Sequence, residues 1–166
     1  MRLDGDVSRM VSKIDSPGLS VVIPTRDRPD KVIGAVESAL AQVACDVEVI
    51  VVDDGPAVPV TIPPHRSIRC IRLDRNQGPA AARNAGLAVA RGRYITFLDD
   101  DDRLLPHMAD VSLSALANSD VASPVAVISG MEVIDRFGEI IERRIPPTHA
   151  KGGHFSLEPL RLGDRM

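Results

Sequence analysis

Aromatic side chains are scarce in this sequence of 166 residues: Phe, Tyr and Trp make up 2% of it, and Trp is absent. This scarcity argues against a surface that stacks carbohydrate rings or bases. The net charge is −3, so no basic field favours nucleic acid or an anionic membrane. No apolar run approaches the length of a bilayer span, and the first residues lack the apolar core of a signal peptide. We therefore predict no nucleic-acid partner, no transmembrane segment and a cytoplasmic location, with peripheral attachment to the inner face of the membrane as the variant.

Cysteine pairs and glycine-rich phosphate loops are also missing. Cys45 and Cys70 have neither metal-site nor redox spacing, which predicts two small core residues in a reducing compartment. No G-x-G-x-x-G follows the first predicted strand and no G-x-x-x-x-G-K-[ST] occurs, so dinucleotide-binding and P-loop folds are excluded. An EF-hand loop that began at Asp99 would need Gly at its sixth position, where Leu104 stands.

What the sequence does contain is an alternation of apolar strands and amphipathic helices. Continuous apolar runs predict buried parallel strands, and a 3.6-residue period predicts helices between them. The expected strands are 19–23, 47–52, 68–73 and 94–98, and the expected helices are 29–42, 78–91 and 104–118. Residues 125–135 and 139–145 predict a hairpin around Arg136–Gly138. The fold class is therefore α/β, a mostly parallel sheet flanked by helices and followed by a mixed or antiparallel hairpin. We expect a mobile arm over 1–17, one domain over 18–145 and a tail over 146–166.

Four consecutive aspartates, Asp99–Asp102, directly follow the last of these strands. Adjacent carboxylates repel one another, so a cluster at the end of a buried strand is most simply explained by a bound divalent cation. Hard oxygen ligands suit Mg²⁺ or Mn²⁺, often shared with nucleotide phosphates. Taken alone, such a run is more often a solvated acidic turn.

The other predicted strands also end in polar residues, at 24–27, 53–54 and 74–76. In a parallel sheet these ends share one edge, where ligands bind at the point of strand-order reversal. Each piece has a purely structural reading as well. Thr25 or Asp27 could cap the following helix, and Arg83 could form an exposed ion pair. Their joint placement at one edge favours a binding site.

Four motifs at this edge resemble family 2 glycosyltransferases: VVIPTRDR at 21–28, VVDDG at 51–55, NQGPAAARNAG at 76–86 and YITFLDDDD at 94–102. The resemblance covers roughly 19–145. It implies the GT-A fold and a nucleotide-diphosphate sugar as donor, most simply a uridine diphosphate sugar.

The resemblance also implies roles for individual residues. Pro24, Thr25, Arg26 and Asp27 would line the nucleoside pocket, Asp53 would accept a hydrogen bond from uracil, and Gly78 and Arg83 would lie near the base and diphosphate. In the D-x-D motif, Asp99 would approach the ribose or the metal, Asp100 would contact the donor, and Asp101 would hold the Mn²⁺ or Mg²⁺. Pro56 departs from the Ser that relatives commonly carry.

An inverting enzyme of this family needs a carboxylate general base on a later segment. Glu158 and Asp164 are the acids of the tail, and neither has the family's context. We therefore expect a donor-binding portion without the base, with an unknown acceptor. The alternative is an inactive remnant that binds a nucleotide sugar or a protein partner. A sugar-phosphate nucleotidyltransferase ranks lower, because its glycine-rich loop is missing at 24–27.

Overall fold

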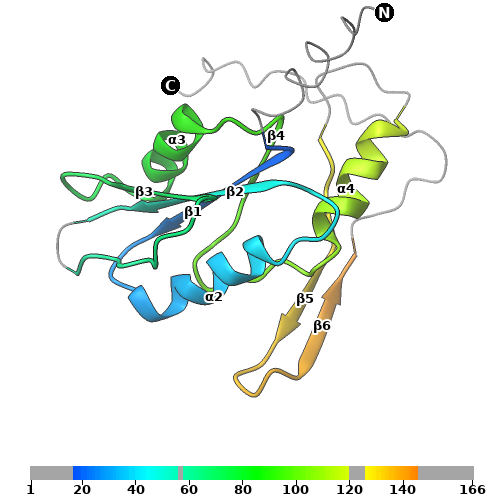
Figure 1. Cartoon of the computed structure of the whole chain (residues 1–166). Coiled ribbons are helices and arrows are strands. Elements are labelled where there is room, and N and C mark those ends of the chain that lie inside the picture. Colours follow the sequence, from blue (N-terminus) through cyan, green and yellow to red (C-terminus); the bar gives the residue numbers. More distant parts are fainter. Residues whose placement is uncertain (1–16, 56–57, 120–125, 146–166) are drawn as a thin grey trace, which may run out of the picture. The chain divides into compact units, whose positions relative to one another are not determined.

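The structure is a computed structural model that describes residues 17–55, 58–119 and 126–145 (Figure 1). The predicted arm and tail therefore lie almost entirely outside the described residues. The chain divides into two compact units, Met1–Val111 and Ser112–Met166.

The first unit is built on a four-stranded parallel sheet. Its strands are β1 (Leu19–Thr25), β2 (Val47–Asp53), β3 (Ile68–Arg72) and β4 (Tyr94–Phe97), in the order β3-β2-β1-β4. The central strands β1 and β2 are buried along almost their whole length, as their β-branched apolar runs predict. The order reverses between β1 and β4, where Val22 lies opposite Phe97. The predicted parallel α/β sheet is confirmed.

One helix packs on each face of this sheet, as Figure 1 shows. Helix α2 (Pro29–Leu40) buries Val32, Val36 and neighbouring alanines against Val21 and Ile23 of β1. Helix α3 (Pro79–Val89) packs on the other face, against Val22 and Val52. Successive side chains of a strand point to opposite faces, so β1 serves both layers at once. Both helices begin with Pro in the first turn, where its missing N–H costs nothing.

Helix α3 approaches the sheet closely at Gly86. A Cβ atom at this position would lie 2.3 Å from Cγ1 of Val22 and 3.2 Å from Cγ2 of Val52. Both neighbours are fully buried and cannot move away. Helix α3 can therefore pack this close to the sheet only because Gly86 has no side chain.

A buried carboxylate links the strands near their amino ends, at the edge of the sheet opposite to their carboxyl ends. Glu48 accepts hydrogen bonds from the Ser20 hydroxyl and from the backbone N–H groups of Arg91 and Gly92. Burial raises the pKa of Glu48, but these hydrogen bonds and the Arg91 guanidinium outweigh it, so the pKa lies below its ordinary value. The charged form of Glu48 joins β1, β2 and the turn before β4.

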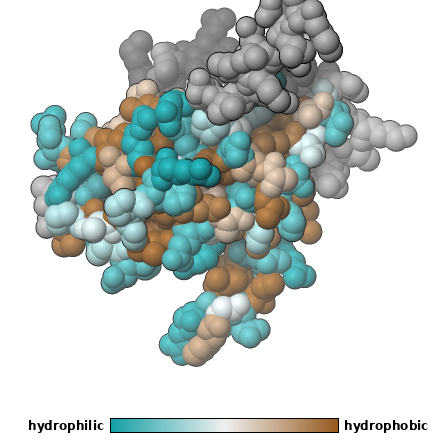
Figure 2. Space-filling view, viewed as in Figure 1, coloured by the Kyte–Doolittle hydropathy of each residue, from teal (hydrophilic) through white to brown (hydrophobic). Residues whose placement is uncertain are grey.

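The second unit contains the predicted hairpin, formed by β5 (Met131–Ile134) and β6 (Ile140–Arg144). Its turn is closed by Asp135, whose carboxylate accepts hydrogen bonds from the N–H groups of Phe137 and Glu139, and Gly138 supplies the positive φ. The hairpin carries both exposed apolar and exposed charged side chains, and Figure 2 shows brown and teal surfaces on it. Helix α4 (Met108–Ala117) spans the unit boundary.

The two cysteines differ from the sequence-based expectation. Cys70 is exposed because β3 is an edge strand, and Cys45 is half-buried in the turn before β2. The prediction of two core cysteines is wrong, since residue type alone does not distinguish an edge strand from a central one. Within the described part of the chain, no helix is long and apolar enough to cross a membrane.

Candidate functional site

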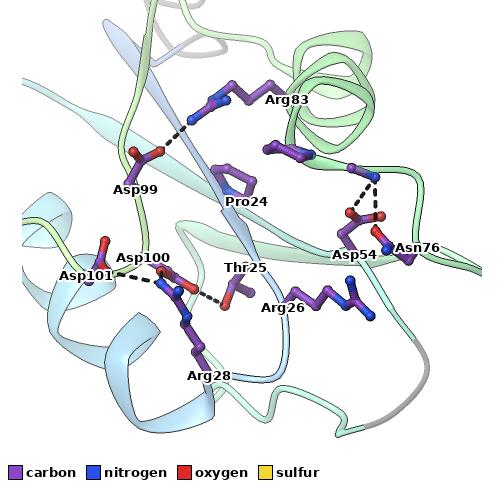
Figure 3. Close-up of a pocket in the computed structure, with 12 residues that line it drawn as sticks. Pro24, Thr25, Arg26, Arg28, Asp54, Asn76, Arg83, Asp99, Asp100 and Asp101 are labelled. Atoms are coloured by element: carbon purple, nitrogen blue, oxygen red, sulfur yellow. Dashed lines mark hydrogen bonds and ion pairs between the residues drawn. The ribbon is translucent and has the colours of Figure 1, made fainter.

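A cavity of about 550 Å³ lies at the carboxyl ends of the parallel strands, where the strand order reverses between β1 and β4. Open α/β sheets bind ligands at this point because the loops diverge there. Figure 3 shows the side chains that surround the cavity. They are Pro24, Thr25, Arg26, Arg28, Asp54, Asn76, Gly78, Pro79, Arg83, Asp99, Asp100 and Asp101.

Asp100 points inward and joins the two strands that flank the reversal. Its side chain is 7% exposed, and its Oδ2 accepts a hydrogen bond of 2.7 Å from the Thr25 hydroxyl. Its Oδ1 lies 3.1 Å from Nη1 of Arg28. Both carboxylate oxygens are therefore engaged by the end of β1 and the residue that begins α2. Asp100 connects the carboxyl ends of β1 and β4.

The flanking carboxylates of Asp99 and Asp101 are half-exposed (Figure 3). Asp99 forms an ion pair with Arg83 of α3 across the cavity. Asp101 contacts Nζ of Lys31 at 3.7 Å and the same Nη1 of Arg28 that contacts Asp100, at 3.1 Å. The outer two carboxylates are therefore more accessible to a ligand than the buried carboxylate of Asp100.

Asp102 lies outside the cavity lining. Burial and the three neighbouring carboxylates raise the pKa of Asp102 above its ordinary value. The adjacent carboxylates therefore repel one another, even though cationic side chains lie beside Asp99, Asp100 and Asp101. A cation placed beside these aspartates would lower their mutual repulsion.

The segment that follows the aspartates is held by polar side chains from the end of α2 and the turn just after it. The Ser38 hydroxyl accepts a hydrogen bond from the N–H of Leu104. Gln42 donates to the carbonyl of Leu105 and accepts from the N–H of Ala109. The aspartates are thus carried by a loop fixed on both sides, by β1 and by α2.

Asp54 organises the opposite wall of the cavity. Its two oxygens accept hydrogen bonds from the N–H groups of Gln77, at 2.7 Å, and Gly78, at 2.8 Å. Gly78 has φ +87°, a backbone conformation that suits glycine at the start of α3. Asp54 therefore fixes the turn that places the amino end of α3, and Arg83 on it, beside the cavity.

The structure brings together the predicted residues Pro24, Thr25, Arg26, Gly78, Arg83, Asp99, Asp100 and Asp101. Two others lie beside the lining. Asp27 has φ +54° and accepts a hydrogen bond from the N–H of Val58, so it fixes the β1–α2 turn. Asp53 accepts from Val60 and lies 3.7 Å from Nε of Arg72, while its Oδ1 is buried with no hydrogen-bond partner among the described residues. The role predicted for Asp53 stays a prediction.

Sequence reasoning assigned no binding role to four lining residues, although it placed the strand ends 53–54 and 74–76 at this edge. They are Arg28, Asp54, Asn76 and Pro79. Asp54 is adjacent to Asp53, for which a role in uracil binding was predicted. Which of the two lines the cavity depends on which side chain at the end of β2 faces it. Arg28 belongs to the first motif, and its place directly before the helix-initiating Pro29 was the available signal. Asn76 and Pro79 lie in the quoted third motif.

The donor set suits a hard divalent cation that also binds phosphate. Asp99 and Asp101 offer carboxylate oxygens on one loop, and Mg²⁺ in such sites takes one or two carboxylates and completes its shell with water and substrate phosphates. Among the described residues no three His, Cys, Asp or Glu side chains converge on one point. A cation here would therefore complete its coordination shell with water or with the oxygens of a bound ligand.

The fold and this cavity define an α/β protein with a cavity at the carboxyl edge of a parallel sheet, where acidic and guanidinium groups are in contact. The chain belongs to glycosyl transferase family 2, whose sequence model matches residues 20–156. It is 39% identical over 127 residues to the succinoglycan biosynthesis protein ExoO of Rhizobium meliloti, covering 74% of this chain and 35% of that protein.

A second relative is WfaP of Escherichia coli, a UDP-Glc:alpha-D-GlcNAc-diphosphoundecaprenol beta-1,3-glucosyltransferase. It is 38% identical over 89 residues, which cover 51% of this chain and 35% of WfaP. The structure of S. aureus TarS 1–349 in complex with UDP-GlcNAc matches with a TM-score of 0.52 and 19% identity, covering 70% of this chain and 40% of TarS. This likeness confirms the GT-A-type fold. The chain spans about a third of the length of these two curated relatives.

Proposed function

We propose that this chain is the donor-binding part of a metal-dependent, inverting glycosyltransferase that takes a UDP-sugar and acts in the cytoplasm. The observation that carries the proposal is the gathering of Asp99, Asp101 and Arg83 around one cavity at the strand-order reversal, where Arg83 forms an ion pair with Asp99. The name of WfaP specifies a UDP-glucose donor, and TarS was crystallised with UDP-GlcNAc. Both favour a uridine nucleotide as the first ligand to test.

The proposed chemistry follows from the charges around the cavity. The Arg83 guanidinium has the fork geometry that suits phosphate oxygens, and on binding it would exchange Asp99 for the diphosphate. Asp99 and Asp101 would hold Mn²⁺ or Mg²⁺. The cation would neutralise the negative charge that develops on the departing diphosphate. Asp54 keeps the amino end of α3 in place beside the nucleotide. These residues bind and orient the donor.

The proposal leaves the general base outside the cavity lining. Each of the four lining carboxylates already accepts a hydrogen bond or ion pair, from backbone N–H groups at Asp54 and from cationic side chains at Asp99, Asp100 and Asp101. A base must be able to take the proton of an acceptor hydroxyl in the transition state. We propose that this carboxylate and the acceptor site come from residues other than those described.

The test is nucleotide- and metal-dependent stabilisation. UDP at a hundred times its Kd stabilises the folded state by about 2.7 kcal/mol, or a Tm rise of about 5 to 10 °C in a chain of this size. We expect that rise only with Mn²⁺ or Mg²⁺ present, and its loss in Asp101→Asn. Asp46→Asn, an exposed aspartate before β2 at the other edge of the sheet, is the matched control and should behave as wild type. No shift with any nucleotide and metal would refute donor binding.

The engaged state of all lining carboxylates favours one second candidate, a nucleotide-sugar-binding module without turnover. The two are separated by incubating the protein with UDP-sugars and measuring released UDP. Sustained release rejects the inactive module. Binding without release rejects turnover by this chain alone.

A further inference from the structure

Arg28 is placed where it contacts two aspartates of the acidic loop with one nitrogen. Its Nη1 lies 3.1 Å from Oδ1 of Asp100 and 3.1 Å from Oδ2 of Asp101 (Figure 3). The residue immediately precedes Pro29, so the start of α2 fixes its backbone. Lys31, in the first turn of α2, adds a second positive charge 3.7 Å from the same Asp101 oxygen.

These contacts differ from the other guanidinium contacts at the cavity. Arg83 contacts Asp99 alone, and Arg26 contacts Asp27, which lies outside the lining. Arg28 touches the inner and an outer carboxylate of the D-x-D motif together. Its side chain is 51% exposed, so it can leave Asp101 without disturbing the packed core. The Arg28 guanidinium, with Lys31 beside it, therefore offsets the negative charge of the part of the loop to which a divalent cation would also be attracted.

We propose that Arg28 is a positioning residue that serves as a built-in counter-ion of the acidic loop and competes with the divalent cation for Asp101. The inference rests on the proposed function, because it assumes that Asp99 and Asp101 attract the cation. Without the cation, the guanidinium relieves the repulsion among the aspartates and keeps the loop ordered. When the cation binds, Arg28 yields Asp101 and keeps its contact with the buried Asp100.

Competition has a measurable consequence in both directions. If the Arg28 contact stabilises the loop only when the cation is absent, the contact and the cation oppose each other. Linkage then requires that the contact weaken cation binding by the same factor by which the cation weakens the contact. Removing Arg28 should therefore destabilise the metal-free protein and tighten cation binding. A guanidinium that only shaped the loop would give the opposite result for the cation, since a disordered loop binds more weakly.

The experiment uses Arg28→Gln and Mn²⁺ alone as the probe. Free Mn²⁺ is counted by electron paramagnetic resonance during a titration, and Tm is measured in EDTA and at saturating Mn²⁺. We expect the Mn²⁺ Kd to fall about threefold to tenfold, the order expected for losing a half-exposed charge beside the site. We also expect the Tm deficit of the variant in EDTA to shrink by about half or more at saturating Mn²⁺.

Two arginine variants and one lysine variant complete the design. Arg143→Gln removes the same charge from an exposed side chain that pairs with Glu132 of the hairpin and is not part of the cavity lining, and its Mn²⁺ Kd should stay within about twofold of wild type. Arg28→Lys keeps the charge and should restore near-wild-type affinity. Lys31 contacts Asp101 alone, so Lys31→Gln should tighten Mn²⁺ binding by a smaller factor than Arg28→Gln. This variant keeps the test available if Arg28→Gln does not fold.

The outcomes separate this inference from the proposed function. If wild-type protein binds Mn²⁺ and neither Arg28→Gln nor Lys31→Gln binds it more tightly, the counter-ion role is refuted and donor binding stands. Weaker binding in Arg28→Gln with a Tm deficit that persists in Mn²⁺ refutes the competition as well. If wild type binds no Mn²⁺ with or without UDP, the metal dependence of the proposed function fails and the inference fails with it.

Discussion

Replacing Thr25 by Val tests the link between β1 and β4 on which the cavity depends. The two side chains have the same shape, so the substitution removes the hydroxyl and little else. That hydroxyl is buried and donates a 2.7 Å hydrogen bond to the carboxylate of Asp100, a residue that is only 5% exposed. A buried carboxylate that loses a donor keeps its desolvation cost without the compensating bond.

The expected loss follows from the charged acceptor. A hydrogen bond to an ionised group contributes about 1.5 to 3 kcal/mol, so Thr25→Val should lower the free energy of unfolding by about 2 kcal/mol. For a chain of this size that corresponds to a Tm lower by about 4 to 8 °C. The assay is urea unfolding followed by far-UV circular dichroism, in which the midpoint should fall while the slope m is unchanged.

Thr61→Val provides the matched control, because Thr61 is exposed in the loop between β2 and β3. An exposed substitution of this kind should change stability by less than about 0.5 kcal/mol. If Thr25→Val also falls within that range, the hydroxyl does not hold Asp100, and the account of the inward carboxylate is wrong. Thr25→Ser, which keeps the hydroxyl, should retain more stability than the Val variant.

Two further predictions concern the scaffold. Gly86→Ala should lower the free energy of unfolding by about 1 to 3 kcal/mol in urea, because its Cβ would overlap the buried Val22; an unchanged midpoint would show that α3 can move outward. Glu48→Gln should cost about 2 kcal/mol near neutral pH. Because the folded-state pKa of Glu48 is lowered, its stabilisation is present above the ordinary value of 4.5 and disappears as the pH falls through the folded-state pKa, so the two proteins should converge in acid. A constant difference down to that range would contradict the ionised role of Glu48.

Much of the fold was predictable from local pattern. The strands at 19–25 and 47–53 are long β-branched runs, and such runs have few alternatives to a buried parallel sheet. The hairpin at 131–144 was predicted from its turn chemistry, with Asp135 and Gly138 at the required places. Element ends were less well placed, since α4 begins at Met108 rather than 104. The segment before Met108 is held instead by Ser38 and Gln42, which bond the backbone of Leu104 and Leu105, and such contacts cannot be read from the local sequence.

The candidate site was predictable in part. Strand ends in a parallel sheet share one edge, so the convergence of 24–25 with 99–101 followed from topology. The choice between Asp53 and Asp54 did not, because it depends on which of two adjacent side chains faces the cavity. Arg28 was missed for the same kind of reason: its partners lie more than 70 residues away in the chain.

The sequence by itself determined the parallel α/β fold, the edge at which polar residues gather and the family to which the chain belongs. These depend on periodicity, turn residues and motif spacing, all of which are local. Only the tertiary structure decided that Asp100 turns inward while Asp99 and Asp101 face the cavity, and that Arg28 stands between two of them. In the sequence the four aspartates are indistinguishable. In the fold they differ, because Thr25 and Arg28 both bond Asp100 and bury it, and these neighbours are brought together only by folding.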